Sequence, residues 1–233
     1  MQLRVLATAG GLVAVDKPAG LLVIPGRAEE GGPCARDLLA AQLGERVWVC
    51  HRIDRDTSGV LVFATTAEAH RAANEAFERG AVKKRYVALV EGRVAAALDL
   101  DVELTEARKG KMRPVRPGEK GKPSRTLVRP RELFAAASLV EAEPLTGRQH
   151  QIRVHLKSAG HPLLFDHQYG RKAPLTAKDL GGAGDEVVLD RTPLHAEALE
   201  APELGLSVTA PLPEDLRRCV ELLREAVGAP RAP

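Results

Sequence analysis

Residues 51–59 read His51-Arg52-Ile53-Asp54-Arg55-Asp56-Thr57-Ser58-Gly59, a polar run between two apolar segments. The segments are Val47-Trp48-Val49 before it and Val60-Leu61-Val62-Phe63-Ala64 after it. Both are short and rich in β-branched residues, a pattern that is typical of buried strands. Catalytic groups are commonly placed on loops that rigid strands hold in position. The run therefore predicts a functional loop between two strands.

Asp54 is the candidate catalytic carboxylate of this loop. Arg52 and Arg55 flank it in the sequence, and nearby positive charge favours the ionised form of a carboxyl group. An ionised aspartate suits a nucleophile or a base better than a proton donor. The alternative is a structural Asp–Arg network that pins the connection, and for an isolated aspartate between two arginines this alternative is the stronger one.

Composition restricts the class of protein. The chain has 233 residues, of which 44% are hydrophobic and 28% charged, values that are ordinary for a soluble globular protein. It has no apolar run long enough to span a bilayer, and its first residues lack the features of a signal peptide. We therefore expect a cytoplasmic protein without a membrane partner. The three cysteines, Cys34, Cys50 and Cys219, have neither disulfide nor zinc spacing, so buried thiols are expected.

Positive charge is concentrated in residues 108–125. This window holds eight Lys/Arg and one Glu, a net charge of +7 in a chain whose net charge is +3. A basic segment broken by Gly and Pro is one that a phosphate backbone would attract. A solvated loop without a partner explains the same pattern about equally well.

Periodicity and end signals predict the main elements. A helix is expected over 34–43, ended by Gly44, and another after a capping box formed by Thr65 and Glu68, ended near Gly80. The buried face of the second helix carries Ala69, Ala72, Ala73, Ala76 and Phe77. A last helix is expected over about 215–227, and strands over 12–15, 84–90 and near 139–140.

The segment 146–162 also predicts a helix. Thr146 and Gln149 fit a capping box, and Gly160 followed by Pro162 is a helix stop. One side of this helix would carry Ile152, Leu156 and Ala159, and another Gln149, His150 and Arg153. The pattern thus predicts an arginine held on a helix with polar companions.

Taken together, the segments 51–64 and 146–156 resemble the RluA-type pseudouridine synthases. Further similarity lies, in the order of that family, in 15–21, 84–92, 160–164 and 194–196. The resemblance runs from about residue 11 to about 212. Gln149 and Phe165 depart from the pattern, where Thr and Gly are usual.

The resemblance implies a fold and a domain organisation. The expected fold is α+β, a single domain with a large mixed, mostly antiparallel sheet flanked by helices. The catalytic domain would span 1–227, and 228–233 would be a disordered tail. The chain starts at the catalytic pattern, so no S4-like RNA-binding domain is expected before it, and the catalytic domain itself would contact the RNA. A monomer is the default expectation.

The resemblance also implies an activity, the isomerisation of uridine to pseudouridine in ribosomal or transfer RNA, with Asp54 as the catalytic residue. Asp56 is the competing carboxylate, and it is ranked as structural. The expected substrate-binding residues are Arg52, which would fill the gap left by the flipped base, Tyr86 and Leu194, which would pack against that base, and Arg153, which would hold the Asp54 carboxylate. No metal and no cofactor are expected, since the chain has neither a metal cluster nor a Gly-rich nucleotide loop.

Two other functions stay open. The first is an RNA-binding module without turnover, although Asp54, Tyr86 and Arg153 are all present. The second is a metal-dependent hydrolase, because the chain has several histidines in its motifs. His150 and His155 are five residues apart, however, so they would not share a helix face as a His-x-x-x-His pair does.

Overall fold

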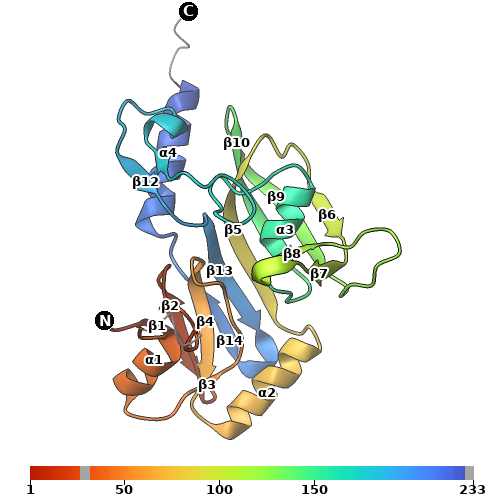
Figure 1. The fold of residues 1–233 in the computed structure, drawn as a ribbon. Helices are drawn as coiled ribbons and strands as arrows, with labels where there is room; N and C mark the ends of the chain where they lie inside the picture. Colours follow the sequence, from red (N-terminus) through yellow and green to blue (C-terminus); the bar gives the residue numbers. More distant parts are fainter. Residues whose placement is uncertain (27–31, 229–233) are drawn as a thin grey trace, which may run out of the picture. The chain divides into compact units, whose positions relative to one another are not determined.

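The structure is a computed structural model that describes residues 1–26 and 32–228. By contacts, the chain divides into two compact units (Figure 1). The first unit contains Met1–Arg85 and His195–Pro211, and the second contains Tyr86–Leu194 and Leu212–Pro233. Strands β5 (Lys83–Glu91) and β13 (Leu194–Ala201) begin in one unit and continue in the other.

The first unit is built on strands near the two ends of the chain. Its strand order is β1-β2-β4-β13, with β3 paired to β4 and β14 paired to β13. Its own elements are β1 (Arg4–Ala9), β2 (Leu12–Lys17), α1 (Ala35–Leu43), β3 (Trp48–Val49), β4 (Ser58–Ala64), α2 (Ala67–Glu78), η3 (Pro202–Leu204) and β14 (Leu206–Thr209).

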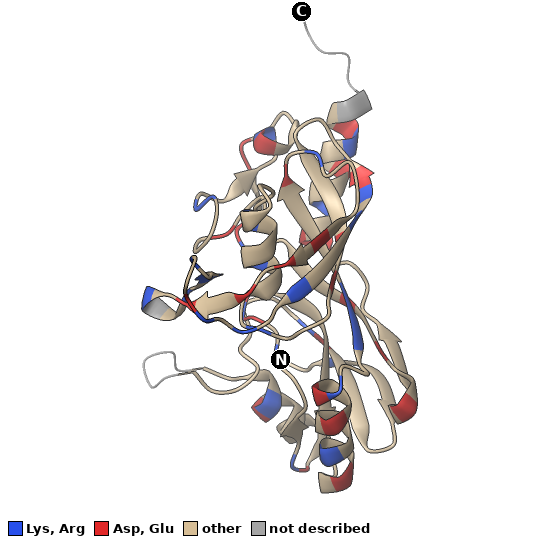
Figure 2. Cartoon of the chain, turned by 90° about the vertical axis from the view of Figure 1, so that its right-hand side faces the viewer, with Lys and Arg blue, Asp and Glu red and all other residues tan. Residues whose placement is uncertain are grey.

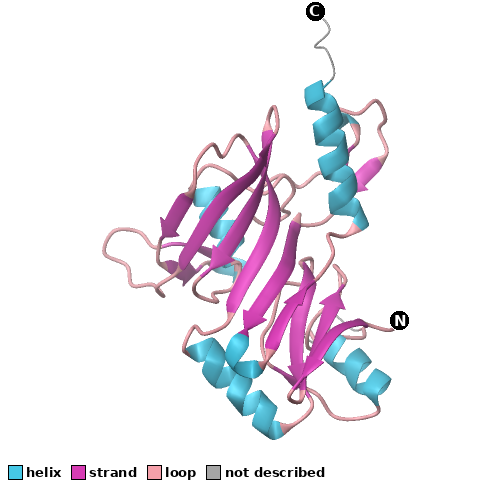
Figure 3. Ribbon diagram, turned by 180° about the vertical axis from the view of Figure 1, so that it is seen from behind, coloured by secondary structure: helices cyan, strands magenta, loops and turns pink. Residues whose placement is uncertain are grey.

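The second unit has the strand order β5-β10-β9-β6 and two further small hairpins, β7-β8 and β11-β12. Its own elements are β6 (Leu98–Asp101), β7 (Leu104–Glu106), η1 (Arg108–Gly110), β8 (Met112–Pro114), β9 (Arg125–Leu133), β10 (Ala137–Pro144), α3 (Gln151–Ser158), β11 (Leu175–Thr176), η2 (Lys178–Leu180), β12 (Val187–Leu189) and α4 (Glu214–Gly228). Figure 3 distinguishes these helices and strands by colour.

The strand pairing confirms the expected α+β class and the large mixed, mostly antiparallel sheet. Ten strands are joined in one hydrogen-bonded order. Strands β4 and β13 pair in parallel, His195 opposite Ser58, whereas β2 with β4 and β10 with β9 pair antiparallel. The single domain expected over 1–227 stays a prediction. Gly228 belongs to α4, and residues 229–233 of the expected tail lie outside the described residues.

The first two helices lie where the sequence predicts them. Helix α1 ends at Gly44, which takes the left-handed conformation (φ 72°) that glycine adopts at little cost. Helix α2 buries Ala69, Ala73 and Ala76, but its cap differs from the predicted box. Thr66 rather than Thr65 is the N-cap, and its hydroxyl accepts a hydrogen bond from the Ala69 amide at 3.1 Å.

Helix α3 starts later than predicted, so the expected capping box of Thr146 and Gln149 is wrong. The helix begins at Gln151, and His150 precedes it with a left-handed backbone (φ 53°). The side-chain oxygen of Gln151 instead accepts the Thr146 hydroxyl at 2.6 Å and the Arg148 amide at 3.0 Å. These hydrogen bonds hold residues 146–150 in a loop before the helix. Gln149 and His150 therefore do not share a helix face with Arg153.

Each unit has an apolar core of its own. In the first unit, α2 packs on β2 and β4 through a cluster that includes Leu12, Val60 and Ala73. In the second unit, α4 and the β11-β12 region bury a cluster that includes Leu89, Phe134 and Leu216. Cys34, Cys50 and Cys219 are buried and free, as predicted, and burial raises the pKa of Cys50 and Cys219 to about 12. Among the described residues, no helix is long and apolar enough to cross a membrane.

Candidate active site

The loop that carries Asp54 is pinned by a buried lysine. Lys17, at the end of β2, is 0% exposed, and its ammonium group donates to three backbone carbonyls. The acceptors are the oxygens of Pro18 (2.8 Å), Leu21 (2.9 Å) and Arg55 (2.9 Å). A buried charge is costly unless hydrogen bonds satisfy it, so this arrangement favours one conformation of the residue that follows Asp54.

Further hydrogen bonds close the same turn. The carbonyl of Arg55 also accepts the Gly20 amide at 2.9 Å, and Nε of Arg55 donates back to the Gly20 carbonyl at 3.0 Å. The Thr57 amide donates to the Asp54 carbonyl at 3.2 Å, which closes a turn at the candidate catalytic residue. The residues 17–21 therefore act as a support for the loop.

The start of the loop is held by a neutral histidine. Nε2 of His51 accepts the backbone N–H of Val62 at 3.1 Å, and its ring packs against Phe77 with 4.9 Å between centroids. Desolvation, with a contribution from the charge of Lys84, lowers the pKa of His51 to about 3. The ring is thus uncharged at neutral pH, as its role of acceptor requires.

The end of the loop is fixed against β13. Gly59 (φ 108°) lies so close to β13 that a Cβ built on it would stand 2.2 Å from the Ala196 carbonyl oxygen. Beside it, the buried hydroxyl of Ser58 is 2.9 Å from Nδ1 of His195, whose Nε2 is 3.3 Å from the Ala210 carbonyl. Burial raises the pKa of Asp16 nearby, against the lowering effects of His195 and Arg4.

Two predicted site residues lie in the first unit. Asp54 is half-buried in the loop between β3 and β4, and Arg52, two residues earlier, is exposed. Ile53 between them is buried, so the loop is anchored by its apolar residue and presents its polar ones. This arrangement fits a loop that meets a ligand from solvent.

The other three lie in the second unit, which brings two of them together. Tyr86 lies on β5 opposite Ala142 of β10 and is half-buried, and Leu194, at the start of β13, is buried. Leu194 belongs to an apolar cluster that also contains Ile152 and Leu156 of α3, and Tyr86 packs against this cluster. An aromatic ring beside an aliphatic side chain can accept the flat face of a nucleobase.

Arg153 of α3 is buried in an ion pair that the sequence analysis did not predict. Its Nε and Nη2 donate to the two carboxylate oxygens of Asp166, both at 2.8 Å, and the exposed fractions of the two side chains are 4% and 1%. Burial opposes the ionisation of Asp166, but the bonds and charge of Arg153, with the amides of Gln168 and Tyr169, keep its pKa below the usual value. The arginine is therefore held in one orientation.

The turn 166–170 makes further contacts with Arg153. The side-chain oxygen of Gln168 accepts Nη2 at 3.3 Å, and the guanidinium lies over the ring of Tyr169, 5.0 Å from its centroid. The same tyrosine contacts two other segments: its hydroxyl accepts the Met112 amide at 2.7 Å and is 2.8 Å from Nδ1 of His150.

Residues 104–122, here called the basic hairpin, comprise β7, η1, β8 and the turn that returns to pair Lys122 with Leu104. Its cations are not equivalent. Arg113 forms two hydrogen bonds with Glu119, at 2.6 and 2.9 Å, whereas the side chains of Lys120 and Lys122 are exposed. Just beyond the hairpin, Arg125 is bound by Asp99. The positive charge available to bind phosphate is therefore smaller than the net charge of +7 counted over residues 108–125.

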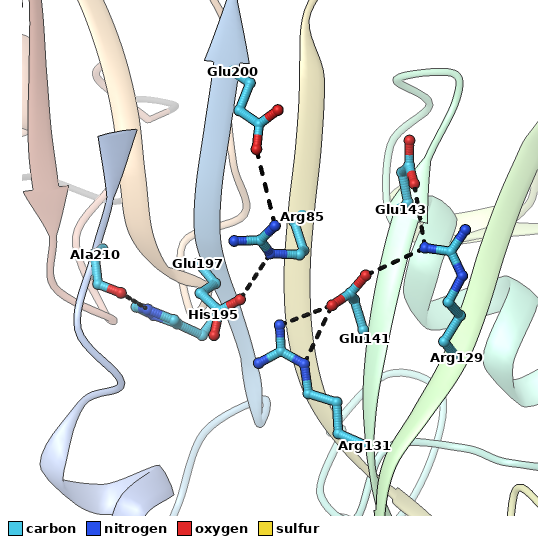
Figure 4. A network of polar contacts seen from close by, with 9 residues as sticks. All are labelled: Arg85, Arg129, Arg131, Glu141, Glu143, His195, Glu197, Glu200 and Ala210. Carbon is cyan, nitrogen blue, oxygen red and sulfur yellow. Dashed lines mark hydrogen bonds and ion pairs between the residues drawn. The ribbon is translucent and has the colours of Figure 1, made fainter. Parts of the chain in front are cut away.

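Basic residues elsewhere on the sheet are largely matched by acids. Figure 2 shows Lys and Arg interspersed with Asp and Glu. In the second unit, Arg131 binds Glu141 at 2.9 Å and Arg129 lies between Glu141 and Glu143, and in the first unit Arg85 binds Glu197 at 3.0 Å (Figure 4). Cations that are paired in this way have little net attraction for a polyanion.

The histidines of the motifs have structural partners. His155 is buried between the Thr126 hydroxyl (2.9 Å) and the Val102 carbonyl (3.0 Å), and His195 is held by Ser58 and Ala210. Over 1–26 and 32–228, no three His, Cys, Asp or Glu residues gather as a group that could hold a metal ion. No residue cluster in this part of the chain supports the hydrolase alternative.

The sequence model described as RNA pseudouridylate synthase matches residues 11–158, a range that contains the pinned loop, Tyr86 and Arg153. The chain belongs to the RNA pseudouridylate synthase family. This confirms the RluA-type resemblance. The ribosomal large subunit pseudouridine synthase D of Nitrosomonas europaea is 38% identical over 95% of this chain and 65% of its own length. Synthase C of Escherichia coli is 37% identical over 92% of this chain and 68% of its own length. The chain thus spans about two thirds of these relatives, and slightly less of the first.

A solved structure of the same family agrees in fold. Human RNA pseudouridylate synthase domain containing 4 superposes with a TM-score of 0.79 at 29% identity, covering 95% of this chain and 93% of that one. In the present chain, Asp54, Tyr86 and Arg153 lie within residues 11–158, the range that the family model matches, and Leu194 lies beyond it.

Sequence reasoning missed Asp166, Gln168 and Tyr169. The available signal was the segment that follows Gly160-His161-Pro162, where Phe165 was noted only as a departure before Asp166. Nothing in the local pattern indicated that Asp166 would bind Arg153, which is 13 residues earlier.

Proposed function

We propose that this protein isomerises uridine to pseudouridine within RNA, with Asp54 as the catalytic residue. The observation that carries the proposal is the placement of a half-buried aspartate in a loop pinned at both ends, in a chain of this family. In the reaction the bond between C1′ and N1 breaks, the uracil turns, and a bond from C1′ to C5 forms as C5 loses its proton. Every atom except the exchanged proton stays within the nucleotide.

We assign the other predicted residues to the handling of the flipped uridine. A base within structured RNA must leave its stack to be reached, and the exposed Arg52 can stack in the gap through its planar guanidinium. Tyr86 and Leu194 would pack against the uracil, since Tyr86 already packs against the apolar cluster that contains Leu194. The Tyr86 hydroxyl would assist the loss of the C5 proton.

Arg153 is the residue that we assign to the Asp54 carboxylate. Asp166 and Gln168 bind its Nε and Nη2. A guanidinium fixed in this way can orient the catalytic carboxylate without a change in its own position. The buried ion pair with Asp166 supports the assignment, because it restricts the arginine to one rotamer.

We propose ribosomal RNA of the large subunit as the substrate, since two of the relatives carry that substrate in their names. Transfer RNA is the alternative. A protein that modifies ribosomal RNA in a bacterium works in the cytoplasm, and we propose a monomer there.

Release of tritium from RNA labelled at uracil C5 tests the activity. The C5 proton is lost only when the new C–C bond forms, so release reports the isomerisation directly. We expect release from large-subunit ribosomal RNA or its assembly intermediates. Release from transfer RNA alone would show that transfer RNA is the substrate. Binding of RNA without tritium release from any of these RNAs would favour an RNA-binding module that has no turnover.

The basic hairpin should supply a measurable share of RNA affinity. We expect the Lys120→Ala/Lys122→Ala variant to bind RNA more weakly and to show a salt dependence, as the slope of log K against log salt, that is shallower by about 1.5. The measurement is a set of binding titrations between low and moderate salt.

The matched control is Lys172→Ala/Lys178→Ala, which removes the same charge from exposed positions outside the hairpin. An equal change of slope in the control would mean that net charge, rather than the hairpin, attracts the RNA. Arg113→Ala should have a smaller effect than loss of Lys120, because Glu119 already binds the Arg113 guanidinium.

A further inference from the structure

The turn 166–170 contacts both Arg153 and the basic hairpin. Toward α3, the Asp166 carboxylate, the Gln168 amide oxygen and the Tyr169 ring surround the guanidinium of Arg153. Toward the hairpin, the Gln168 carbonyl accepts Nζ of Lys111 at 3.1 Å, and the Tyr169 hydroxyl accepts the Met112 amide at 2.7 Å. Two adjacent residues, Gln168 and Tyr169, thus connect the basic hairpin to Arg153.

The turn itself is stiff. The amides of Gln168 and Tyr169 donate to one oxygen of Asp166, at 2.9 and 3.1 Å, and the Gly170 amide donates to its backbone carbonyl at 2.8 Å. Tyr169 is buried and packs with Leu104, Met112 and Val154. A displacement of the hairpin cannot be absorbed inside this turn and must move the groups that surround Arg153.

The Tyr169 hydroxyl has a further partner at the start of α3. A phenol has one proton, and its oxygen accepts the Met112 amide, so it can donate that proton to Nδ1 of His150. His150 is the residue before α3, and among the described residues it is the one non-glycine residue with a positive φ. The hydroxyl therefore joins the hairpin to His150, the N-cap of the helix that carries Arg153 and three residues before the arginine.

We propose that Tyr169 is a positioning residue that couples the basic hairpin to Arg153, so that the seating of the hairpin on RNA steadies the turn that holds the arginine in its one orientation. Tyr169 is buried beside the guanidinium, and it would act through Arg153 rather than by contact with RNA. The proposal rests on the proposed function for its kinetic consequence, whereas the coupling itself is a property of the second unit and can be measured without turnover.

The test uses Tyr169→Phe, which keeps the ring under Arg153 and removes the hydroxyl. We expect the single-turnover rate on RNA to fall about tenfold while the dissociation constant for RNA changes less than about twofold, because one net hydrogen-bond contribution is lost from positioning rather than from phosphate contact. The amide proton of Met112 should exchange faster with solvent, and the NMR signal of the Arg153 Nε–H should shift.

The second arm perturbs the coupling from the hairpin side. Lys111→Met removes the bond to the Gln168 carbonyl, and it should also shift the Arg153 Nε–H signal. Lys178→Met is the matched control on an exposed position of η2, and it should leave that signal unchanged. The rate effects of Tyr169→Phe and Lys111→Met should be less than additive, because both act on one coupling.

The outcomes separate the two hypotheses. An Arg153 signal that does not respond to Lys111→Met, or rates for Tyr169→Phe equal to those of the parent, would overturn the coupling. Absence of turnover in the parent protein would contradict the proposed function, and the response of the Arg153 signal would still decide the coupling. Thermal unfolding of each variant identifies any loss of folded protein.

Discussion

Asp54→Asn is expected to bind RNA as the parent protein does and to isomerise uridine at least about 10⁴-fold more slowly, the scale of loss when a nucleophile is removed. Asparagine has nearly the same shape as aspartate but is neither a base nor a useful nucleophile. The loop should keep its conformation, because its supports are Lys17, His51 and Ser58 rather than the Asp54 side chain alone. The measurement is single-turnover tritium release together with RNA binding.

Asp56→Asn is the matched control for this experiment. It makes the same chemical change two residues along the same half-buried loop. We expect it to keep turnover within about tenfold of the parent, an effect of the size of a disturbed hydrogen bond. If Asp56→Asn lost turnover and Asp54→Asn kept it, the catalytic assignment would pass to Asp56.

The second large effect is expected for Asp166→Asn. This change leaves the guanidinium of Arg153, which is 4% exposed, without its carboxylate partner. Breaking a buried ion pair by removing one member costs about 3–5 kcal/mol, so the melting temperature should fall by roughly 10 °C. The measurement is thermal or denaturant unfolding near neutral pH.

Asp99→Asn is a control with the same bonding geometry. Asp99 also takes two hydrogen bonds from one guanidinium, that of Arg125, at 2.9 and 2.6 Å. Both side chains of this pair are about half exposed (49% and 47%), so water can replace either partner. We expect little change in stability, and equal losses in the two variants would show that bonding geometry rather than burial sets the cost.

The stability that Asp166 contributes should depend on pH in one direction. Its pKa is lower in the folded protein than the ordinary value of 3.8, so on acidification the unfolded chain binds a proton before the folded one does. The contribution is complete above the ordinary pKa and is lost as the pH falls toward the folded pKa. The difference in stability between the parent and Asp166→Asn should therefore be largest near neutral pH and decrease below about pH 4.

The elements whose signals are local could be predicted from the sequence. The polar run 51–59 and its apolar flanks become β3, a loop and β4, and Gly44 ends α1 as expected. These features depend on alternating or helical periodicity and on single residues at turns, which the chain encodes within a few positions. The family and its α+β fold followed from the same short segments.

Local patterns were less reliable where side chains had a choice of partner. Thr146 and Gln149 fit a capping box, but the Gln151 side chain takes the Thr146 hydroxyl and the helix starts after His150. Both arrangements satisfy the polar groups, and only the packing around the turn distinguishes them. The state of the thiols and of His51 likewise depends on burial. The sequence indicated that the three cysteines are buried, but it did not indicate that His51 is neutral.

The pairing of residues from separate segments was decided by the path of the chain. Arg153 was identified from its motif, but its buried partner Asp166 and the Tyr169 ring beneath it come from a turn with no recognisable periodicity. Lys17 likewise reaches Arg55, 38 residues away, because β2 and β4 pair antiparallel. The sequence therefore indicated the candidate residues for the chemistry, and tertiary packing specified what holds each of them. Ion pairs and hydrogen bonds over such separations exist only after the strands and helices have assembled.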